Sequence, residues 1–169
     1  HDDEIHDPAA GTGGFLIHAF EHILEKTDQG AELSREERRA LTTENLTGAE
    51  LVPETRRLGL MNLALHNLQP QNFDVANSLT SREHANRSYD VVLTNPPYGG
   101  TQPESPARDD FMVETRSPEQ NFVQHAMSIL RDGGECGMVV PDGVLFQSGA
   151  AERIRKNLLE DFDLHTVLV

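Results

Sequence analysis

Two short segments combine residues that could hold a ligand with residues that could act on one. The first runs from Asp7 to Phe15 with the sequence Asp-Pro-Ala-Ala-Gly-Thr-Gly-Gly-Phe, and the second is Asn95-Pro96-Pro97-Tyr98. Glycines let the backbone turn tightly and approach a ligand without a Cβ in the way. Prolines fix the backbone and remove amide donors, which leaves the Asn95 side chain and the Pro96 carbonyl pointing outward. The two segments therefore suggest a ligand-binding loop and a polar clamp.

The glycine-rich loop favours a nucleotide-like ligand over phosphate transfer. It lacks the lysine of the G-x-x-x-x-G-K-[ST] pattern. A loop between a strand and a helix is where such cofactors bind in open α/β sheets, and an acidic residue after the next strand usually holds the ribose. Glu50 occupies that place. The alternative for Glu50 is a carboxylate near the start of a helix at Pro53, where it would favour the helix dipole.

The second segment suits a planar base that carries an exocyclic amine. Such an amine needs acceptors for its two N–H groups, and the base needs a ring to stack on. Asn95 and the carbonyl of Pro96 offer the acceptors, and Tyr98 offers the ring. Taken alone, the segment could equally be a plain turn made by proline.

The elements that would position these residues alternate between strands and helices. We expect strands at 4–7, 45–51, 72–76, 89–94, 136–140 and 164–169. Helical spacing predicts one buried face at Leu58, Leu60, Met61, Ala64 and Leu65, and another from Phe122 to Leu130 that ends at Gly133-Gly134. Residues 27–43 look like a polar insertion with a capping box at Ser34 and Glu37, and residues 99–117 look like a mobile loop. The alternation predicts an α/β fold with a doubly wound, mostly parallel sheet.

Length and charge limit the function classes. A chain of 169 residues with 37% hydrophobic content has the size of one domain. A formal charge of -14 argues against holding DNA alone, because lysines and arginines supply most DNA affinity, although acidic surface can also serve solubility only. The sequence has no eighteen-residue apolar run, no signal-peptide pattern and one cysteine, so we expect a cytoplasmic protein without membrane contact. His18 and His22 lack the H-E-x-x-H arrangement, and we predict no metal site.

The order of the two segments resembles that in amino-group DNA methyltransferases, in which a donor loop precedes Asn-Pro-Pro-(Tyr/Phe) on a Rossmann-like sheet. The likeness extends to D-P-A-A-G-T-G-G-F-L, G-A-E-L-V-P-E-T-R-R-L-G-L-M-N-L, Y-D-V-V-L-T-N-P-P-Y-G-G, V-V-P-D-G-V-L-F and I-R-K-N-L-L-E-D-F-D-L-H-T-V-L. Together these segments are similar to the modification subunit of type I restriction-modification systems. The resemblance spans nearly the whole chain except residues 27–43 and 101–117.

The resemblance implies a class I S-adenosylmethionine-dependent fold and assigns donor-binding residues. Asp7 would bind the methionine end of the donor, Glu50 would hold the ribose hydroxyls, and Leu51 would pack on the donor's adenine. The other donor-binding positions implied are Pro8, Ala9, Gly11, Thr12, Gly13, Phe15, Asn77, Ser78 and Leu79. Asn77 departs from the family, which usually has aspartate there, so donor affinity is the property most affected.

The resemblance also implies the reaction and the partners. A target adenine flipped out of DNA would meet the catalytic segment Asn95, Pro96, Pro97 and Tyr98, and its N6 amine would be methylated. A specificity subunit would recognise the DNA, and a restriction nuclease subunit would join the complex. The resemblance also allows a second copy of the modification subunit in the same complex. Residues 1–169 would be the catalytic core, without the family's N-terminal helical region and C-terminal tail.

Two other functions fit part of this pattern. Methylation of a glutamine amide in a protein, or of RNA, uses the same Asn-Pro-Pro-Tyr chemistry, but the Asp7-Pro8-Ala9 start and the segment 141–146 favour DNA. A non-catalytic assembly subunit that keeps the fold but has lost donor binding is the third reading, and Asn77 is its only hint.

Overall fold

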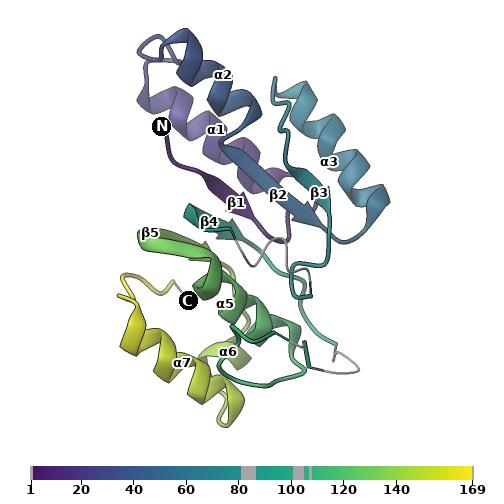
Figure 1. The fold of residues 1–169 in the computed structure, drawn as a ribbon, viewed down its shortest axis with the longest axis vertical. Helices are drawn as coiled ribbons and strands as arrows, with labels where there is room; N and C mark the ends of the chain where they lie inside the picture. Colours follow the sequence, from purple (N-terminus) through teal and green to yellow (C-terminus); the bar gives the residue numbers. More distant parts are fainter. Residues whose placement is uncertain (1, 81–86, 101–104, 107, 169) are drawn as a thin grey trace.

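The computed structural model describes residues 2–80, 87–100, 105–106 and 108–168. In chain order, its elements are β1 (Ile5–Asp7), α1 (Gly14–Lys26), α2 (Arg35–Thr43), β2 (Leu46–Glu50), α3 (Pro53–Leu65), β3 (Phe73–Val75), β4 (Tyr89–Thr94), α5 (Pro118–Ile129), β5 (Leu130–Met138), α6 (Asp142–Phe146) and α7 (Ala150–Asp161). The strands form one parallel sheet in the order β3-β2-β1-β4-β5 (Figure 1). The order changes direction between β1 and β4, which makes this the topological switch point.

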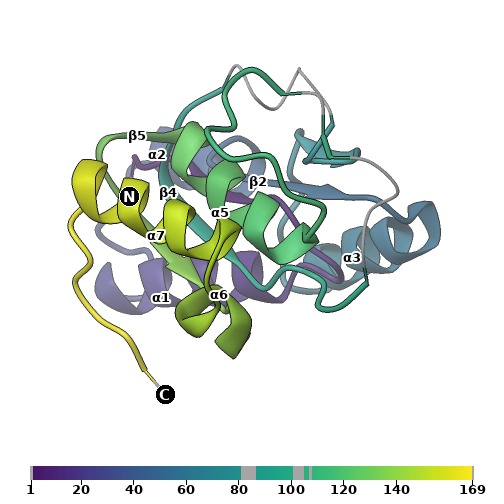
Figure 2. The ribbon, with the colours of Figure 1, turned by 90° about the horizontal axis from the view of Figure 1, so that it is seen from below.

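Helices cover both faces of the sheet. Val91 and Leu93 of β4 pack against the core cluster that contains α1, whereas Val92 packs against Ala126 and Ile129 of α5. Successive residues of a strand point to opposite faces, so α1 and α5 lie on opposite sides of β4 (Figures 1 and 2). The predicted doubly wound α/β fold is confirmed.

The first four predicted strands are present, each ending within one residue of its expected bounds. The capping box of α2 is also formed: the Ser34 amide donates to Glu37 Oε2 at 2.7 Å, and the Glu37 amide donates to Ser34 Oγ at 3.2 Å. Among the helices of the described residues, none has both the length and the apolar composition needed to cross a membrane.

The predictions for the last part of the chain, after α5, are partly wrong. β5 begins at Leu130, so Gly133 and Gly134 lie inside the strand and do not end the helix. A Cβ on Gly134 would lie 2.7 Å from the Asp90 carbonyl oxygen, so the strand approaches β4 too closely for a side chain there. Of the strand predicted at 164–169, residues 164–168 form no strand and Leu168 is 92% exposed, while position 169 lies outside the described residues.

The face of α3 that packs on the sheet is not the one that apolar spacing predicts. Gly59 and Leu63 are buried, whereas Leu58, Met61 and Leu65 are exposed. A Cβ on Gly59 would come within 3.0 Å of the Gly11 carbonyl oxygen and of the Phe73 ring, which are contacts of the buried face. The close approach permitted by glycine therefore determines which side of α3 faces inward.

Candidate functional site

The predicted donor and clamp residues lie at the carboxyl ends of four adjacent strands. Asp7 ends β1, Glu50 ends β2, Asn77 follows β3 and Asn95 follows β4. All four strands are parallel neighbours, so these ends meet at one edge of the sheet. The structure thus brings together segments that are up to 88 residues apart in the chain.

Glu50 joins the donor loop to the start of α3. Its Oε2 accepts a hydrogen bond from the Gly11 amide at 3.0 Å, and its Oε1 accepts one from the Val52 amide at 2.8 Å. The same carboxylate therefore contacts both the loop and the start of the helix, and its role towards a ribose stays a prediction. Each carboxylate oxygen keeps a second lone-pair direction for a ligand hydroxyl.

The donor loop forms a cradle that faces open space. Gly11 has φ +53°, and a Cβ built on it would meet no atom within 4 Å. The loop is supported from behind by α3, where Asn62 Nδ2 donates to the Thr12 carbonyl at 3.0 Å. Leu51, beside Glu50, is 59% exposed and has an apolar surface free to cover a planar ring. These features fit S-adenosylmethionine, which carries an adenine, a ribose and a charged methionine end.

Gly13 is the position of this loop that a side chain would disturb most. Its φ is +81°, and a Cβ would lie 3.1 Å from Leu63 Cγ. We expect Gly13→Ala to lower the free energy of unfolding by about 1–3 kcal/mol, because it combines left-handed strain with crowding. Denaturant titration measures this change. Gly14→Ala is the matched control: Gly14 begins α1 and has open space around it, so a result equal to that of Gly13→Ala would contradict the prediction.

Asp7 is a buried carboxylate in an acidic setting. Burial raises its pKa from 3.8 to about 6, opposed by the hydrogen bond from the Ala9 amide (3.0 Å) and by the nearby Thr94 hydroxyl, while the charge of Glu50 adds to the rise. Thr94 directly precedes Asn95. The base of the donor loop and the start of the clamp are therefore adjacent.

The segment 77–79, which follows β3, is bonded to the glycine-rich loop. Ser78 Oγ donates to the Pro8 carbonyl at 2.6 Å, and Asn77 Oδ1 accepts from the Leu79 amide at 3.1 Å. Of the remaining predicted donor residues, Pro8, Ser78 and Leu79 are buried, and surface remains exposed at Ala9, Thr12 and Phe15. The buried residues support the loop, and the exposed ones are accessible to a ligand.

The clamp is exposed where a substrate would meet it. Asn95 and Pro97 are exposed, Tyr98 is 49% exposed, and Pro96 is buried. The Tyr98 hydroxyl donates to Asn95 Oδ1, so the two functional side chains of the segment contact each other. The next residue, Gly99, donates its amide to Glu119 Oε1 at 2.5 Å, which ties the end of the clamp to the first turn of α5.

Four residues support the site although the sequence did not mark them. Glu119 and Asn62 anchor the clamp and the donor loop, as described above. Arg108 and Gln124 hold the chain that follows the clamp. For Glu119 and Gln124 the available signal was the run of polar residues inside α5, a helix that packs on the sheet, whereas Asn62 and Arg108 lie outside α5.

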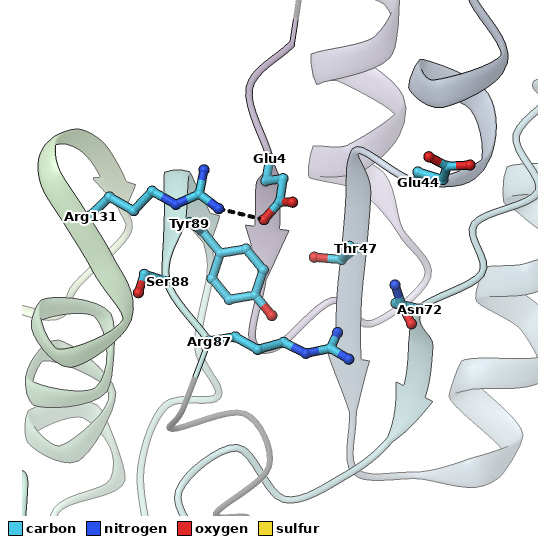
Figure 3. A pocket seen from close by; sticks show the side chains of 8 residues that line it. All are labelled: Glu4, Glu44, Thr47, Asn72, Arg87, Ser88, Tyr89 and Arg131. Carbon is cyan, nitrogen blue, oxygen red and sulfur yellow. Dashed lines mark hydrogen bonds and ion pairs between the residues drawn. The ribbon is translucent and has the colours of Figure 1, made fainter. Parts of the chain in front are cut away.

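A hollow of about 400 Å³ lies at the opposite edge of the sheet (Figure 3). It is lined by residues at the amino ends of the strands, among them Glu4 before β1, Asn72 before β3 and Tyr89 at the start of β4. Arg131 pairs with Glu4 across it at 2.9 Å. None of the predicted donor or clamp residues lines this hollow.

The sheet order, the glycine-rich loop after β1 and the polar segment after β4 define the Rossmann-like fold of class I methyltransferases. A putative class I S-adenosylmethionine-dependent methyltransferase from Listeria monocytogenes has this fold, with a TM-score of 0.65 at 18% identity over 92% of this chain and 44% of that one. The N-6 DNA Methylase family model matches residues 1–169, and the chain belongs to this family.

Two relatives show how much of a larger protein is matched. The methylase subunit of the type I restriction enzyme StySPI from Salmonella potsdam is 37% identical over 97% of this chain and 32% of its own length. The methylase subunit of the type I restriction enzyme EcoKI from Escherichia coli K12 is another sequence relative. The crystal structure of the EcoKI M protein superimposes with a TM-score of 0.85 at 34% identity, over 93% of this chain and 33% of that one. This chain therefore spans about a third of the length of the curated relatives that it matches.

Proposed function

We propose that this chain is the catalytic core of a type I modification subunit, which transfers a methyl group from S-adenosylmethionine to the N6 amine of adenine in DNA. The observation that carries the proposal is the adjacency of the two motifs. The donor loop follows β1, the clamp follows β4, and β1 and β4 are neighbours at the switch point of the sheet. A donor held by the loop would thus lie next to a base held by the clamp.

The clamp residues supply orientation and electrostatic stabilisation. Asn95 Oδ1 and the Pro96 carbonyl would accept the two N–H groups of the target amine, and Tyr98 would stack on the base. These hydrogen bonds hold the nitrogen in line with the methyl group and favour a pyramidal amine whose lone pair is no longer delocalised into the ring. S-adenosylmethionine supplies the electrophilic methyl group on its sulfonium when bound. Asn95 Oδ1 can receive the amine because it has a second lone pair beside the Tyr98 contact.

DNA recognition is assigned to partner subunits. The chain carries a formal charge of -14, which opposes DNA binding by its surface alone. We infer that a basic specificity subunit holds the DNA, and that a restriction nuclease subunit and a second modification subunit belong to the same complex. With DNA as its substrate, the protein would act in the cytoplasm. The family match favours this function over methylation of a protein glutamine or of RNA.

The direct test is a methylation assay with the full-length protein and its specificity subunit. Radiolabelled S-adenosylmethionine is incubated with DNA, RNA and protein substrates, and the methylated product is identified by mass spectrometry. The proposal expects N6-methyladenine in DNA. Label in a glutamine side chain or in RNA, or no transfer by a complex that binds the donor, would reject it.

The Asn77 departure has a measurable consequence for the donor. We expect Asn77→Asp in the full-length protein to tighten S-adenosylmethionine binding by about threefold to tenfold, because a charged acceptor forms stronger hydrogen bonds with the donor's adenine amine. The Asp side chain can still accept from the Leu79 amide, so the turn is kept. Calorimetric titration measures the Kd. Asn157→Asp adds the same charge on α7 and serves as control, and weaker binding by Asn77→Asp would contradict the prediction.

A further inference from the structure

Residues 108–117, called the strap below, follow the clamp along the chain and are held by polar side chains of α5. Gln124 Nε2 donates to the Val113 carbonyl at 2.9 Å, and Gln124 Oε1 accepts from the Val113 amide at 2.8 Å. Asn121 Nδ2 donates to the Thr115 carbonyl at 3.0 Å. The predicted mobile loop therefore has a fixed course at these residues, while its positions 101–104 and 107 lie outside the described residues.

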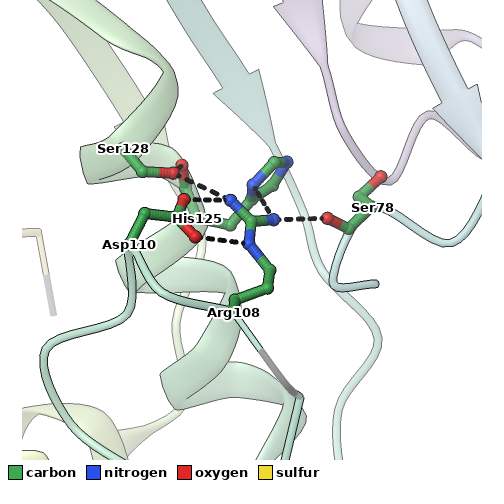
Figure 4. A network of polar contacts seen from close by, with 5 residues as sticks. All are labelled: Ser78, Arg108, Asp110, His125 and Ser128. Carbon is green, nitrogen blue, oxygen red and sulfur yellow. Dashed lines mark hydrogen bonds and ion pairs between the residues drawn. The ribbon is translucent and has the colours of Figure 1, made fainter. Parts of the chain in front are cut away.

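Arg108 begins the strap and is its most extensively bonded side chain. The side chain is only 3% exposed. Its Nη1 donates to the Ser78 carbonyl at 2.8 Å and lies 2.9 Å from His125 Nδ1, and its Nη2 donates to Ser128 Oγ at 3.2 Å. Its Nε donates to Asp110 Oδ1 at 2.9 Å (Figure 4). One planar guanidinium thus joins the strap, α5 and the segment after β3.

Ser78 connects this network to the donor loop. The residue accepts from Arg108 through its carbonyl and donates from its hydroxyl to the Pro8 carbonyl at 2.6 Å. Its neighbours Asn77 and Leu79 form the rest of segment 77–79. A continuous path of hydrogen bonds therefore runs from the strap through Arg108 and Ser78 to Pro8.

We propose that Arg108 is a positioning residue that holds segment 77–79 against the donor loop and couples it to the strap beside the clamp. It acts through Ser78, so its loss should weaken donor binding more than the transfer step. A buried carbonyl left without its charged donor costs more than an exposed one, because water cannot replace the bond. Lysine should not substitute, since the bonds to Ser78, Ser128 and Asp110 leave from three different guanidinium nitrogens, whereas the donors of an ammonium all lie on one nitrogen. The inference rests on the proposed function, because it takes the loop as the donor site.

The test uses the full-length protein with its specificity subunit. Arg108→Ala and Arg108→Lys are expected to raise the Kd and the KM for S-adenosylmethionine by about tenfold or more, with kcat at saturating donor within about threefold of the wild type. Arg155→Ala is the matched control. Arg155 also bonds backbone carbonyls, those of Val144 (2.8 Å) and Gln147 (2.9 Å), and its loss should leave both constants unchanged.

A double-mutant cycle tests the path itself. If Arg108 acts through Ser78, the effects of Arg108→Ala and Ser78→Ala on the donor Kd should be less than additive. A donor Kd within twofold of the wild type in folded Arg108→Ala, or reduced kcat with unchanged KM, would overturn the proposal. If Arg108→Ala does not fold, the same limits applied to Arg108→Lys decide. Donor binding is measured without DNA, so a wild-type complex that binds donor but methylates no adenine would reject the proposed function alone.

Discussion

Replacing Asn95 with alanine in the full-length subunit is expected to reduce methyl transfer sharply while leaving donor binding intact. The change removes an acceptor for the target amine, and losing one such preorganised group lowers kcat by roughly a hundredfold to a thousandfold. Asn95 is exposed and its side chain bonds Tyr98, a partner within the same segment, so the fold should not depend on it. Methylation kinetics and calorimetric titration with S-adenosylmethionine measure the two properties separately.

Two further variants sharpen the Asn95 experiment. Asn95→Asp keeps an acceptor of the same shape and should retain more activity than the alanine variant. Asn157→Ala removes a side-chain amide from α7 and should methylate at the wild-type rate. Unchanged activity in Asn95→Ala would reject the catalytic assignment, and a parallel loss of donor binding would move Asn95 into the donor site.

The second large effect is expected at Asp7. Asp7→Asn should weaken S-adenosylmethionine binding by at least about tenfold at pH 8, because an amide lacks the charge that attracts the cationic methionine end. The asparagine oxygen can still accept from the Ala9 amide, so the loop keeps that contact. In the wild type, donor affinity should fall as the pH drops below about 6, where Asp7 becomes protonated. An Asp7→Asn variant that binds donor like the wild type across this range would reject the role.

The stability of the ligand-free protein should change with pH in the direction opposite to that of donor affinity. The folded pKa of Asp7 is raised from 3.8 to about 6, so the folded state binds this proton more tightly than the unfolded state. The stabilisation from the protonated form is complete below pH 4 and is lost as the pH rises to 6. Above that pH, the ionised carboxylate costs the ligand-free protein about 1–3 kcal/mol. Asp7→Asn lacks this cost, so its melting temperature at pH 8 without donor should exceed that of the wild type, and a lower one would contradict the argument.

The sequence predicted the bounds of β4 correctly but the buried face of α3 wrongly, and the difference has a physical reason. β4 was predicted at its observed bounds, Tyr89–Thr94, because a short β-branched and apolar segment that runs directly into Asn95-Pro96-Pro97 leaves few alternatives. In α3, apolar residues occur on several sides, and the inward side was set by Gly59 and its approach to the donor loop. That choice depends on tertiary contacts that helical spacing does not contain.

The candidate site divides in the same way. Residues of local motifs, such as Asp7 and Asn95, could be predicted because a loop or turn carries its own signature. Arg108 could not, since its importance comes from Ser78, thirty positions earlier, and from α5, which follows it. The strand predicted at 164–169 shows the converse. An apolar composition predicted it, but a strand needs a neighbour to pair with, and among the described residues 164–168 have none.

At Val113 and Thr115, the helix α5 holds the strap through backbone groups of the strap and not through its exposed side chains. Val113 is held through its backbone amide and carbonyl and Thr115 through its carbonyl. The residues that alternate with them, Met112, Glu114 and Arg116, are exposed. The bonds from Gln124 and Asn121 therefore place few demands on the chemistry of those three positions. Substitutions at these three positions, in evolution or by protein engineering, can change the charge or size of the surface beside the clamp while the backbone of the strap keeps its conformation.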